Sequence, residues 1–334
     1  MKPYLVDVPV RVTIWIRPEC QKKQFEILKE ARPSIIFLQS DGGRNEKEWA
    51  AIYENRKLFD EGIDWDCTVY KIYENKNQGL YAMGKKVAKL IWETVDRCIF
   101  LEDDILPSVS FFKYCANLLD YYENDYRIDC ICGMNHLGVS ENVSSDYFFS
   151  RQGSIWGTAT WKRSVEMRDK ELSYKDDPYI LDLLKQRTKR NPTFKRKMIG
   201  YTQNPQYDGH VAGAEFFRSM AMYEHNQLQI IPKVNLISNI GCTADSAHAD
   251  SLKALPRGVQ KMFNMKTHEI EFPLKHAKFV IPDVQYEKKR NRILGYNTPL
   301  VSVYRKTERA LRKIFTGDIK YVLKKIFGAK INET

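Results

Sequence analysis

The first third of the chain alternates short apolar runs with stretches of helical spacing. The apolar runs, rich in β-branched and aromatic residues that favour strands, cover 11–16, 34–39, 68–72 and 97–101. Between them, 19–32 and 79–95 carry apolar residues three and four positions apart, as amphipathic helices do. Strands that alternate with helices predict an α/β fold with a mostly parallel central sheet flanked by helices.

The rest of the chain is less regular. Strands are expected over 128–134 and 228–235, and helices over 108–124 and 209–226. Residues 241–255 are small and polar, which is typical of a mobile loop.

The C-terminal part has a different pattern. From Thr307 to Phe327 most apolar residues fall on one helical stripe, and Arg and Lys occupy the remainder. Gly317-Asp318 interrupts the pattern. We therefore expect a C-terminal extension of short basic amphipathic helices.

Composition indicates a globular protein with a basic surface. Hydrophobic residues make up 43%, which is enough for a substantial core, and the formal net charge is +11. A basic surface favours polyanionic partners. The seven cysteines have no paired spacing, the N-terminus lacks a signal-peptide pattern, and no run approaches the roughly 20 apolar residues of a membrane span. These features predict a cytoplasmic protein with buried thiols.

Polar residues follow each of the first four predicted strands, where ligands bind in parallel sheets. In chain order they are Arg17, Asp41 with Arg44, Asn77 with Gly79, and Glu102-Asp103-Asp104. A solvated turn would account for the three carboxylates, since burying charge is costly. Alternatively, carboxylate oxygens suit Mn²⁺ or Mg²⁺, which can bridge the phosphates of a nucleotide diphosphate.

The surrounding motifs resemble a known family. They are Arg17-Pro18, LQSDGGR (38–44), DWDC (64–67), ENKNQGL (74–80), FLEDDILPSVSFFKYC (100–115), SRQGSIWGTATWKR (150–163) and PKVNLISNIG (232–241). Their order and spacing resemble the bacterial glycosyltransferases of the GT-A fold related to family 2, and more distantly N-acetylglucosaminyltransferase I. The resemblance covers residues 1–250.

The resemblance implies a donor site with assigned roles. Asp104 would bind the metal, Asp103 the donor ribose, and Glu102 would support the nucleotide or sugar. Asp41 resembles the carboxylate that hydrogen-bonds uracil, which favours a UDP-sugar. Arg17 would approach the base or diphosphate, although Ile16 stands where relatives have Asn. The remaining residues expected at this edge are Arg44, Asn77 and Gly79.

A metal or phosphate contact is expected from His248. Relatives carry an acidic residue and then a histidine soon after Asn-Ile-Gly, and here the stretch is NIGCTADSAH. Cys242-Thr243 replaces their glycine-aromatic pair, which puts the loop geometry in doubt.

The base and the sugar pocket are expected in the second half. Inverting transfer needs a carboxylate that removes the acceptor proton. Asp208 is predicted to cap the helix over 209–226 and to act as this base, with Glu215 as a structural residue. Trp156 and Gly157 are expected to line the sugar pocket, since aromatic rings stack on sugars and glycine allows close approach. Trp161 fits an ordinary core equally well.

These inferences predict a hexosyl- or N-acetylhexosaminyltransferase of bacterial surface polysaccharide synthesis. Its catalytic domain would span 1–255, with a nucleotide-binding half (1–105) and an acceptor half (106–255), followed by the extension 256–334. The acceptor would be a glycan or lipid-linked saccharide. The basic extension would meet an anionic membrane, or alternatively pack on the domain or form a homodimer contact.

Two other classes compete with this prediction. A sugar-phosphate nucleotidyltransferase shares the sheet and a metal site, but it usually has a glycine-rich loop after the first strand. Here that place holds IRPECQKKQ. A nucleic-acid-binding protein would suit the basic surface, but no reader motif is present, so we expect no nucleic-acid partner.

Overall fold

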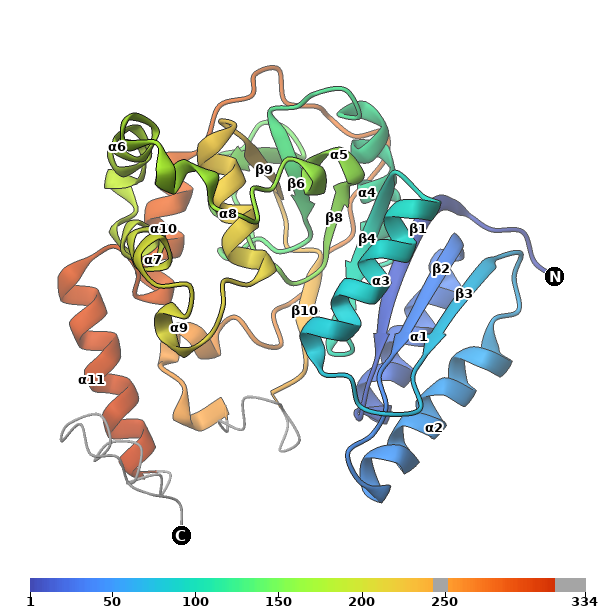
Figure 1. Ribbon diagram of the computed structural model, residues 1–334. Coiled ribbons are helices and arrows are strands. Elements are labelled where there is room, and N and C mark those ends of the chain that lie inside the picture. Colours follow the sequence, from blue (N-terminus) through green and yellow to red (C-terminus); the bar gives the residue numbers. More distant parts are fainter. Residues whose placement is uncertain (243–251, 316–334) are drawn as a thin grey trace, which may run out of the picture.

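The computed structural model describes residues 1–242 and 252–315, except for the side chain of Asp208. Within them, one eight-stranded sheet has the strand order β3-β2-β1-β4-β8-β6-β9-β7 (Figure 1). Its strands are β1 (Val6–Ile14), β2 (Pro33–Ser40), β3 (Thr68–Tyr73), β4 (Arg97–Leu101), β6 (Ile128–Cys132), β7 (Tyr147–Ser150), β8 (Thr158–Trp161) and β9 (Leu228–Pro232). β5 (Ile105–Pro107) and β10 (Ile237–Asn239) form a separate antiparallel pair.

The predicted α/β architecture is confirmed. β1 to β4 are mutually parallel, as are β6 and β9, whereas β7 and β8 pair antiparallel with their neighbours. The helices are α1 (Pro18–Ala31), α2 (Glu46–Gly62), α3 (Leu80–Thr94), α4 (Ser110–Tyr121), α5 (Lys162–Glu166), α6 (Pro178–Arg187), α7 (Pro192–Gln203), α8 (Ala214–Glu224), α9 (Arg257–Gln260), α10 (Val284–Leu294) and α11 (Pro299–Phe315).

The two faces of the sheet are covered by different helices. Alternate residues of β1, from Val8 to Ile14, are fully buried in one core with residues of α1, α2 and α4. On the other face, Phe37 and Ile72 pack with the apolar side of α3. Successive strand side chains point to opposite faces, so Arg11 and Thr13 lie on the α3 side of β1.

Several predicted bounds differ from the structure. β1 begins at Val6 rather than at residue 11, and the basic stretch 185–197 ends α6 and begins α7. α8 begins at Ala214 after an N-cap at Gly213, so the prediction of a helix from 209 is wrong. None of the described helices is long and apolar enough to cross a membrane.

Residues beyond 255 are part of the packed structure. Met262, Leu274 and Tyr286 are buried, and single bridges join Phe263 and Pro282 to strands of the main body. The hydroxyl of Tyr286, on α10, lies 3.0 Å from Nδ1 of His136. α10 is therefore anchored on the sheet by an aromatic side chain.

This anchoring predicts a large effect of truncation at Tyr286. Tyr286→Ala removes a buried aromatic ring and should lower the free energy of unfolding by about 3 kcal/mol or more. Tyr296→Ala, at a half-exposed tyrosine beyond the same helix, should change it by less than about 1 kcal/mol. Urea denaturation followed by tryptophan fluorescence measures both. Equal effects would show that α10 is not anchored through Tyr286.

Candidate functional site

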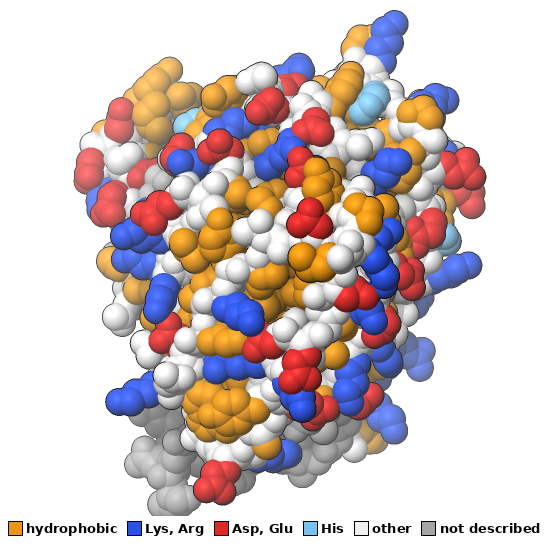
Figure 2. Space-filling view, turned by 90° about the vertical axis from the view of Figure 1, so that its right-hand side faces the viewer, with side chains coloured by type: hydrophobic (Ala, Val, Ile, Leu, Met, Phe, Trp, Pro, Cys, Tyr) orange, Lys and Arg blue, Asp and Glu red, His pale blue; other side chains and the backbone are white. Residues whose placement is uncertain are grey.

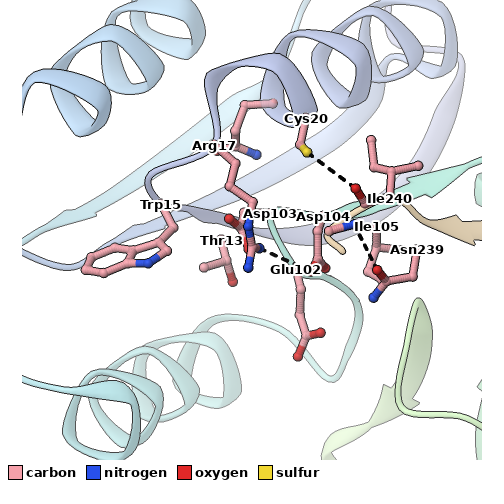
Figure 3. Close-up of polar contacts among 12 residues, drawn as sticks. Thr13, Trp15, Arg17, Cys20, Glu102, Asp103, Asp104, Ile105, Asn239 and Ile240 are labelled. Atoms are coloured by element: carbon pink, nitrogen blue, oxygen red, sulfur yellow. Dashed lines mark hydrogen bonds and ion pairs between the residues drawn. The ribbon is translucent and has the colours of Figure 1, made fainter. Parts of the chain in front are cut away.

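The first four strands end together at one edge of the sheet. Ile14 is in register with Ser40, and Ser40 is in register with Tyr73. Since these strands are parallel to β4, the residues that follow them meet at this edge. Figure 3 shows the part of this edge where Arg17 meets the acidic cluster.

Arg17 is the cation of this edge. Its Nη1 lies 2.8 Å from Oδ1 of Asp103 and 3.1 Å from Oδ2 of Asp104. All three side chains are only 10–15% exposed. Buried charges are tolerated when they are paired and hydrogen-bonded, so Arg17 allows both carboxylates to lie inside.

Glu102 faces a different environment from the other two acidic residues. Its side chain points away from Arg17 (Figure 3). Burial raises its pKa, and the charge of Arg11 on the neighbouring strand opposes that shift. Arg11 in turn lies over the ring of Phe100, at 5.3 Å. The acidic cluster therefore points to two sides of the chain, with Asp103 and Asp104 toward Arg17 and Glu102 away from it.

The Asp103–Asp104 pair is incompletely satisfied. Burial raises the pKa of Asp103 to about 7, with Arg17 opposing the shift and the neighbouring carboxylates adding to it. Burial also raises the pKa of Asp104. Within the described part of the chain, Oδ2 of Asp103 and Oδ1 of Asp104 are buried and have no hydrogen-bond partner. Such oxygens fit a hard cation, which would offset their charge.

The β5–β10 pair brings a distant segment against Asp104. The amide of Ile240 donates to the carbonyl of Asp104 at 2.9 Å. A Cβ on Gly241 would lie 2.0 Å from Oδ2 of Asp104, so only glycine fits at this position. The pairing of Asn239 with Ile105 sets the geometry of this contact.

A complete metal site is not visible in the described residues. They contain no group of three or more His, Cys, Asp or Glu side chains placed to hold a metal ion. The predicted ligand His248 lies outside the described residues, in 243–251. Asp103 and Asp104 thus supply two carboxylates of the kind that Mn²⁺ or Mg²⁺ prefers.

Asp41 joins the loops that follow β2 and β3. One of its oxygens accepts from the amides of Gly42 and Gln78, both at 2.8 Å, and the other accepts from the amide of Gly79 at 2.9 Å. The side-chain amide of Asn77 donates to the carbonyl of Gly42 at 2.7 Å. The structure therefore brings Asp41, Asn77 and Gly79 together, and gives Asp41 a structural role that the sequence did not predict.

Arg44 lies at the border of this region. Its guanidinium pairs with Glu48 at 2.5 Å and lies 5.8 Å from the ring of Trp15. The side chain is 62% exposed. It remains accessible to a ligand at the sheet edge.

Arg56 is a contributor that sequence reasoning missed. This buried residue of α2 donates to Ser40 Oγ at 2.9 Å and to the carbonyl of Glu74 at 2.8 Å. It thereby ties together the ends of β2 and β3. Its signal was its place in the apolar stripe of α2, four residues after Ile52 and three before Phe59.

The segment with Trp156 and Gly157 lies beside the acidic edge. Gly157 has a φ of +57°, and a Cβ there would lie 2.8 Å from Ile237. Packing therefore requires glycine at position 157. Trp156 is half-buried and its ring lies 5.2 Å from that of Phe263. Trp161 is a core residue.

Buried arginines hold this segment from behind. Arg218 of α8 donates to the carbonyl of Ser154 at 3.1 Å, and Arg290 of α10 donates to that of Gly153 at 2.8 Å. Nε of Arg218 lies 3.9 Å from the fully buried carboxylate of Asp129. These contacts join residues more than 60 positions apart, so no local sequence pattern predicts them.

The two candidate bases differ in what the structure shows. The backbone of Asp208 belongs to a 3₁₀ turn, Tyr207–Gly209. Because α8 starts six residues later, the predicted N-cap role of Asp208 is wrong. Glu215 is exposed in the first turn of α8, and its charge contributes to raising the pKa of Glu102. The charge of Glu215 therefore acts on the acidic edge.

Comparison with known proteins gives only distant likenesses. No family model and no curated protein matches the chain. A mannosyltransferase from Pyrobaculum calidifontis in complex with GDP-Man and Mn²⁺ is 12% identical over 49% of this chain and 48% of its own, with a TM-score of 0.32. UDP-glucose pyrophosphorylase complexed with UDP-glucose is 11% identical over 48% of this chain and 78% of its own, with a TM-score of 0.30.

Mouse xyloside xylosyltransferase 1 is 13% identical over 67% of this chain and 84% of its own, with a TM-score of 0.35. This chain spans about half the length of the mannosyltransferase. At these TM-scores the likenesses do not assign an activity to the chain.

The raised pKa of Asp103 predicts a pH dependence of stability. The folded state binds the Asp103 proton more tightly than the unfolded state does. The resulting contribution to the free energy of unfolding is fully present below about pH 4 and is lost as the pH rises through about 7. In chelator, thermal stability should therefore fall over this range more steeply in the wild type than in Asp103→Asn. Asp66→Asn, at an exposed carboxylate, should keep the wild-type slope. If thermal stability fell with pH equally in all three proteins, Asp103 would not be a buried carboxylate that binds a proton in this range.

Proposed function

We propose that this chain is a glycosyltransferase that moves a sugar from a UDP-sugar donor with the help of Mn²⁺ or Mg²⁺. The observation that supports it most is the buried Asp103–Asp104 pair at the carboxyl edge of a parallel sheet, in which one oxygen of each side chain has no partner among the described residues. Asp104 and Asp103 would hold the cation, with His248 as a further ligand. A cation bound there would offset the negative charge of the departing diphosphate.

Arg17 has a second role in this proposal. It now compensates two carboxylates, and its buried Nε has no partner among the described residues. With a cation held by these carboxylates, the guanidinium of Arg17 would be available to bind the diphosphate. Arginine suits this role because its planar donors match phosphate oxygens.

The loops after β2 and β3 would bind the nucleoside. Asp41 fixes both loops through backbone amides, and only the oxygen that accepts from Gly79 keeps a second lone pair for the N–H of a uracil ring. The backbone of Gly79 is open, since a Cβ there would meet nothing within 4 Å. Arg44 lies at the border, and Trp156 would contact the sugar from the opposite side.

We propose Glu215 as the base of an inverting transfer. A base must lie near the reacting sugar, and Glu215 is an exposed carboxylate whose charge acts on Glu102. It would take the proton of the acceptor hydroxyl as that oxygen attacks the anomeric carbon, while the diphosphate leaves with the bonding electron pair. Asp208 stays the second candidate from its position in the sequence.

The acceptor is proposed to be a glycan or lipid-linked saccharide, as in bacterial surface polysaccharide synthesis. The competing class is a nucleotidyltransferase, since one likeness is to a pyrophosphorylase. The segment after β1 has no glycine between Arg17 and Ala31 to wrap a triphosphate. Incubation with UTP, a sugar phosphate and Mg²⁺ should therefore yield no UDP-sugar.

Metal-dependent nucleotide binding is the first test. In Mn²⁺ the wild type should bind UDP by calorimetry and lose this affinity in chelator. Asp104→Asn keeps the shape of the side chain but removes its charge, and should weaken binding at least about tenfold. Asp66→Asn should bind like the wild type. A wild type without metal-dependent affinity for UDP, GDP, dTDP or their sugars would end the proposal.

The second test separates the two candidate bases. With a UDP-sugar that the protein binds, Glu215→Gln should lower kcat for transfer or slow donor hydrolysis by about 10²–10⁴-fold and change donor KM little. Asp208→Asn should keep most of the activity. The reverse result would assign the base to Asp208, and full activity in both variants would exclude each of them.

A further inference from the structure

Helix α11 has its apolar side turned to the solvent. Its exposed apolar residues follow helical spacing of three, four and seven positions. They are Leu300, Val303, Tyr304, Leu311, Ile314 and Phe315. Leu300 and Phe315, at the two ends, are 85% and 86% exposed. These six residues, named here the α11 stripe, run the whole length of the helix.

The polar side of α11 makes the contacts with the body. Glu308 accepts from the backbone amide of Arg257 at 2.9 Å, and Arg312 donates to the carbonyl of Lys253 at 3.2 Å. Near the helix start, Ser302 donates to the carbonyl of Gly295 at 2.5 Å. A helix that only stabilised the domain would bury its apolar side instead. The orientation of α11 is the opposite of that expectation.

Positive charge is concentrated around this helix. Residues 284–315 contain nine Lys and Arg against two acidic residues, and residues 178–200 contain seven against one. The two segments meet where the amide of Thr193 donates to Oδ1 of Asn297 at 3.1 Å. α6, α7, α10 and α11 lie together at one end of the molecule (Figure 1).

The opposite end has a different surface. Figure 2 shows the face that carries α2 and β3, where acidic and basic side chains are intermixed. Ion pairs such as Lys22–Glu54 and Lys71–Asp60 lie there. The net charge of the protein is therefore borne by the end with α11.

We propose that α11 docks the protein on an anionic lipid bilayer. The α11 stripe would enter the boundary between headgroups and acyl chains, and cations such as Lys306 and those of α7 and α10 would meet the lipid phosphates. A second copy of the chain is a poorer occupant, because two stripes could meet only by bringing two strongly basic ends together. The proposal does not depend on the transferase activity.

Vesicle sedimentation with the full chain tests the docking. The wild type should sediment with vesicles of phosphatidylcholine containing about one third phosphatidylglycerol, and much less with phosphatidylcholine alone or in high salt. Val303→Asn with Leu311→Asn should reduce the bound fraction at least about tenfold, since both apolar contacts are lost. Lys306→Glu should weaken binding mainly at low salt.

Matched controls keep the result interpretable. Tyr53→Asn and Lys57→Glu change an exposed apolar residue and an exposed cation on α2, at the other end, and should bind vesicles like the wild type. All variants should keep the wild-type circular dichroism, because the substituted side chains are exposed. Docking is overturned if the wild type does not sediment with anionic vesicles, or if the stripe variant binds as well as the wild type. It is also overturned if light scattering shows a dimer that the stripe variant abolishes.

Discussion

The structure is organised around the cost of placing acidic residues at the end of a central buried strand. β4 lies between β1 and β8, so its end cannot be solvated freely. The compensation comes from β1, the parallel neighbour: Arg11 within the strand offsets Glu102, and Arg17 just beyond it offsets Asp103 and Asp104. This strand order brings both cations into place across more than 80 residues of sequence. Within the described residues two carboxylate oxygens still lack partners, and in the proposed function a cation would offset this remaining deficit.

A second set of buried charges supports the part of the sheet edge that lies opposite the loops after β2 and β3. Gly241 lets its backbone segment approach Asp104 closely, Gly157 does the same toward Ile237, and neither position has room for a larger residue. The segment before Gly157 is held by Arg218 and Arg290 through its carbonyls. Arg218 also belongs to the helix that carries Glu215. A single helix therefore orients the candidate base and the segment that would face the sugar.

The sequence predicted the features that depend on local patterns. The strands of the first half, their helices and the meeting of Arg17, Asp41 and Asp104 at one edge followed from apolar periodicity and chain order. Arg218 could not be found in this way, because its partners Ser154 and Asp129 are distant in sequence. Arg56 stands in the apolar stripe of α2, but only its contacts with Ser40 and Glu74 show what it does. The apolar spacing that continues back through Val211 and Ala212 predicts an earlier start for α8, whereas Gly209 and Gly213 allow a non-helical turn.

The orientation of α11 determines how the two ends of the molecule would face a membrane in the proposed docking. The sequence predicted an amphipathic stripe only from Thr307, and the part of it beyond Phe315 lies outside the described residues. The contacts of Ser302, Glu308 and Arg312 show which side of α11 faces the body. The loops that follow β2 and β3 lie at the far end of the sheet from α11 (Figure 1). Docking through the α11 stripe would therefore turn the second half of the chain toward the lipid and leave the loops after β2 and β3 toward water. This arrangement suits a reaction between a soluble donor and an acceptor held at the membrane, because each substrate would approach from its own phase.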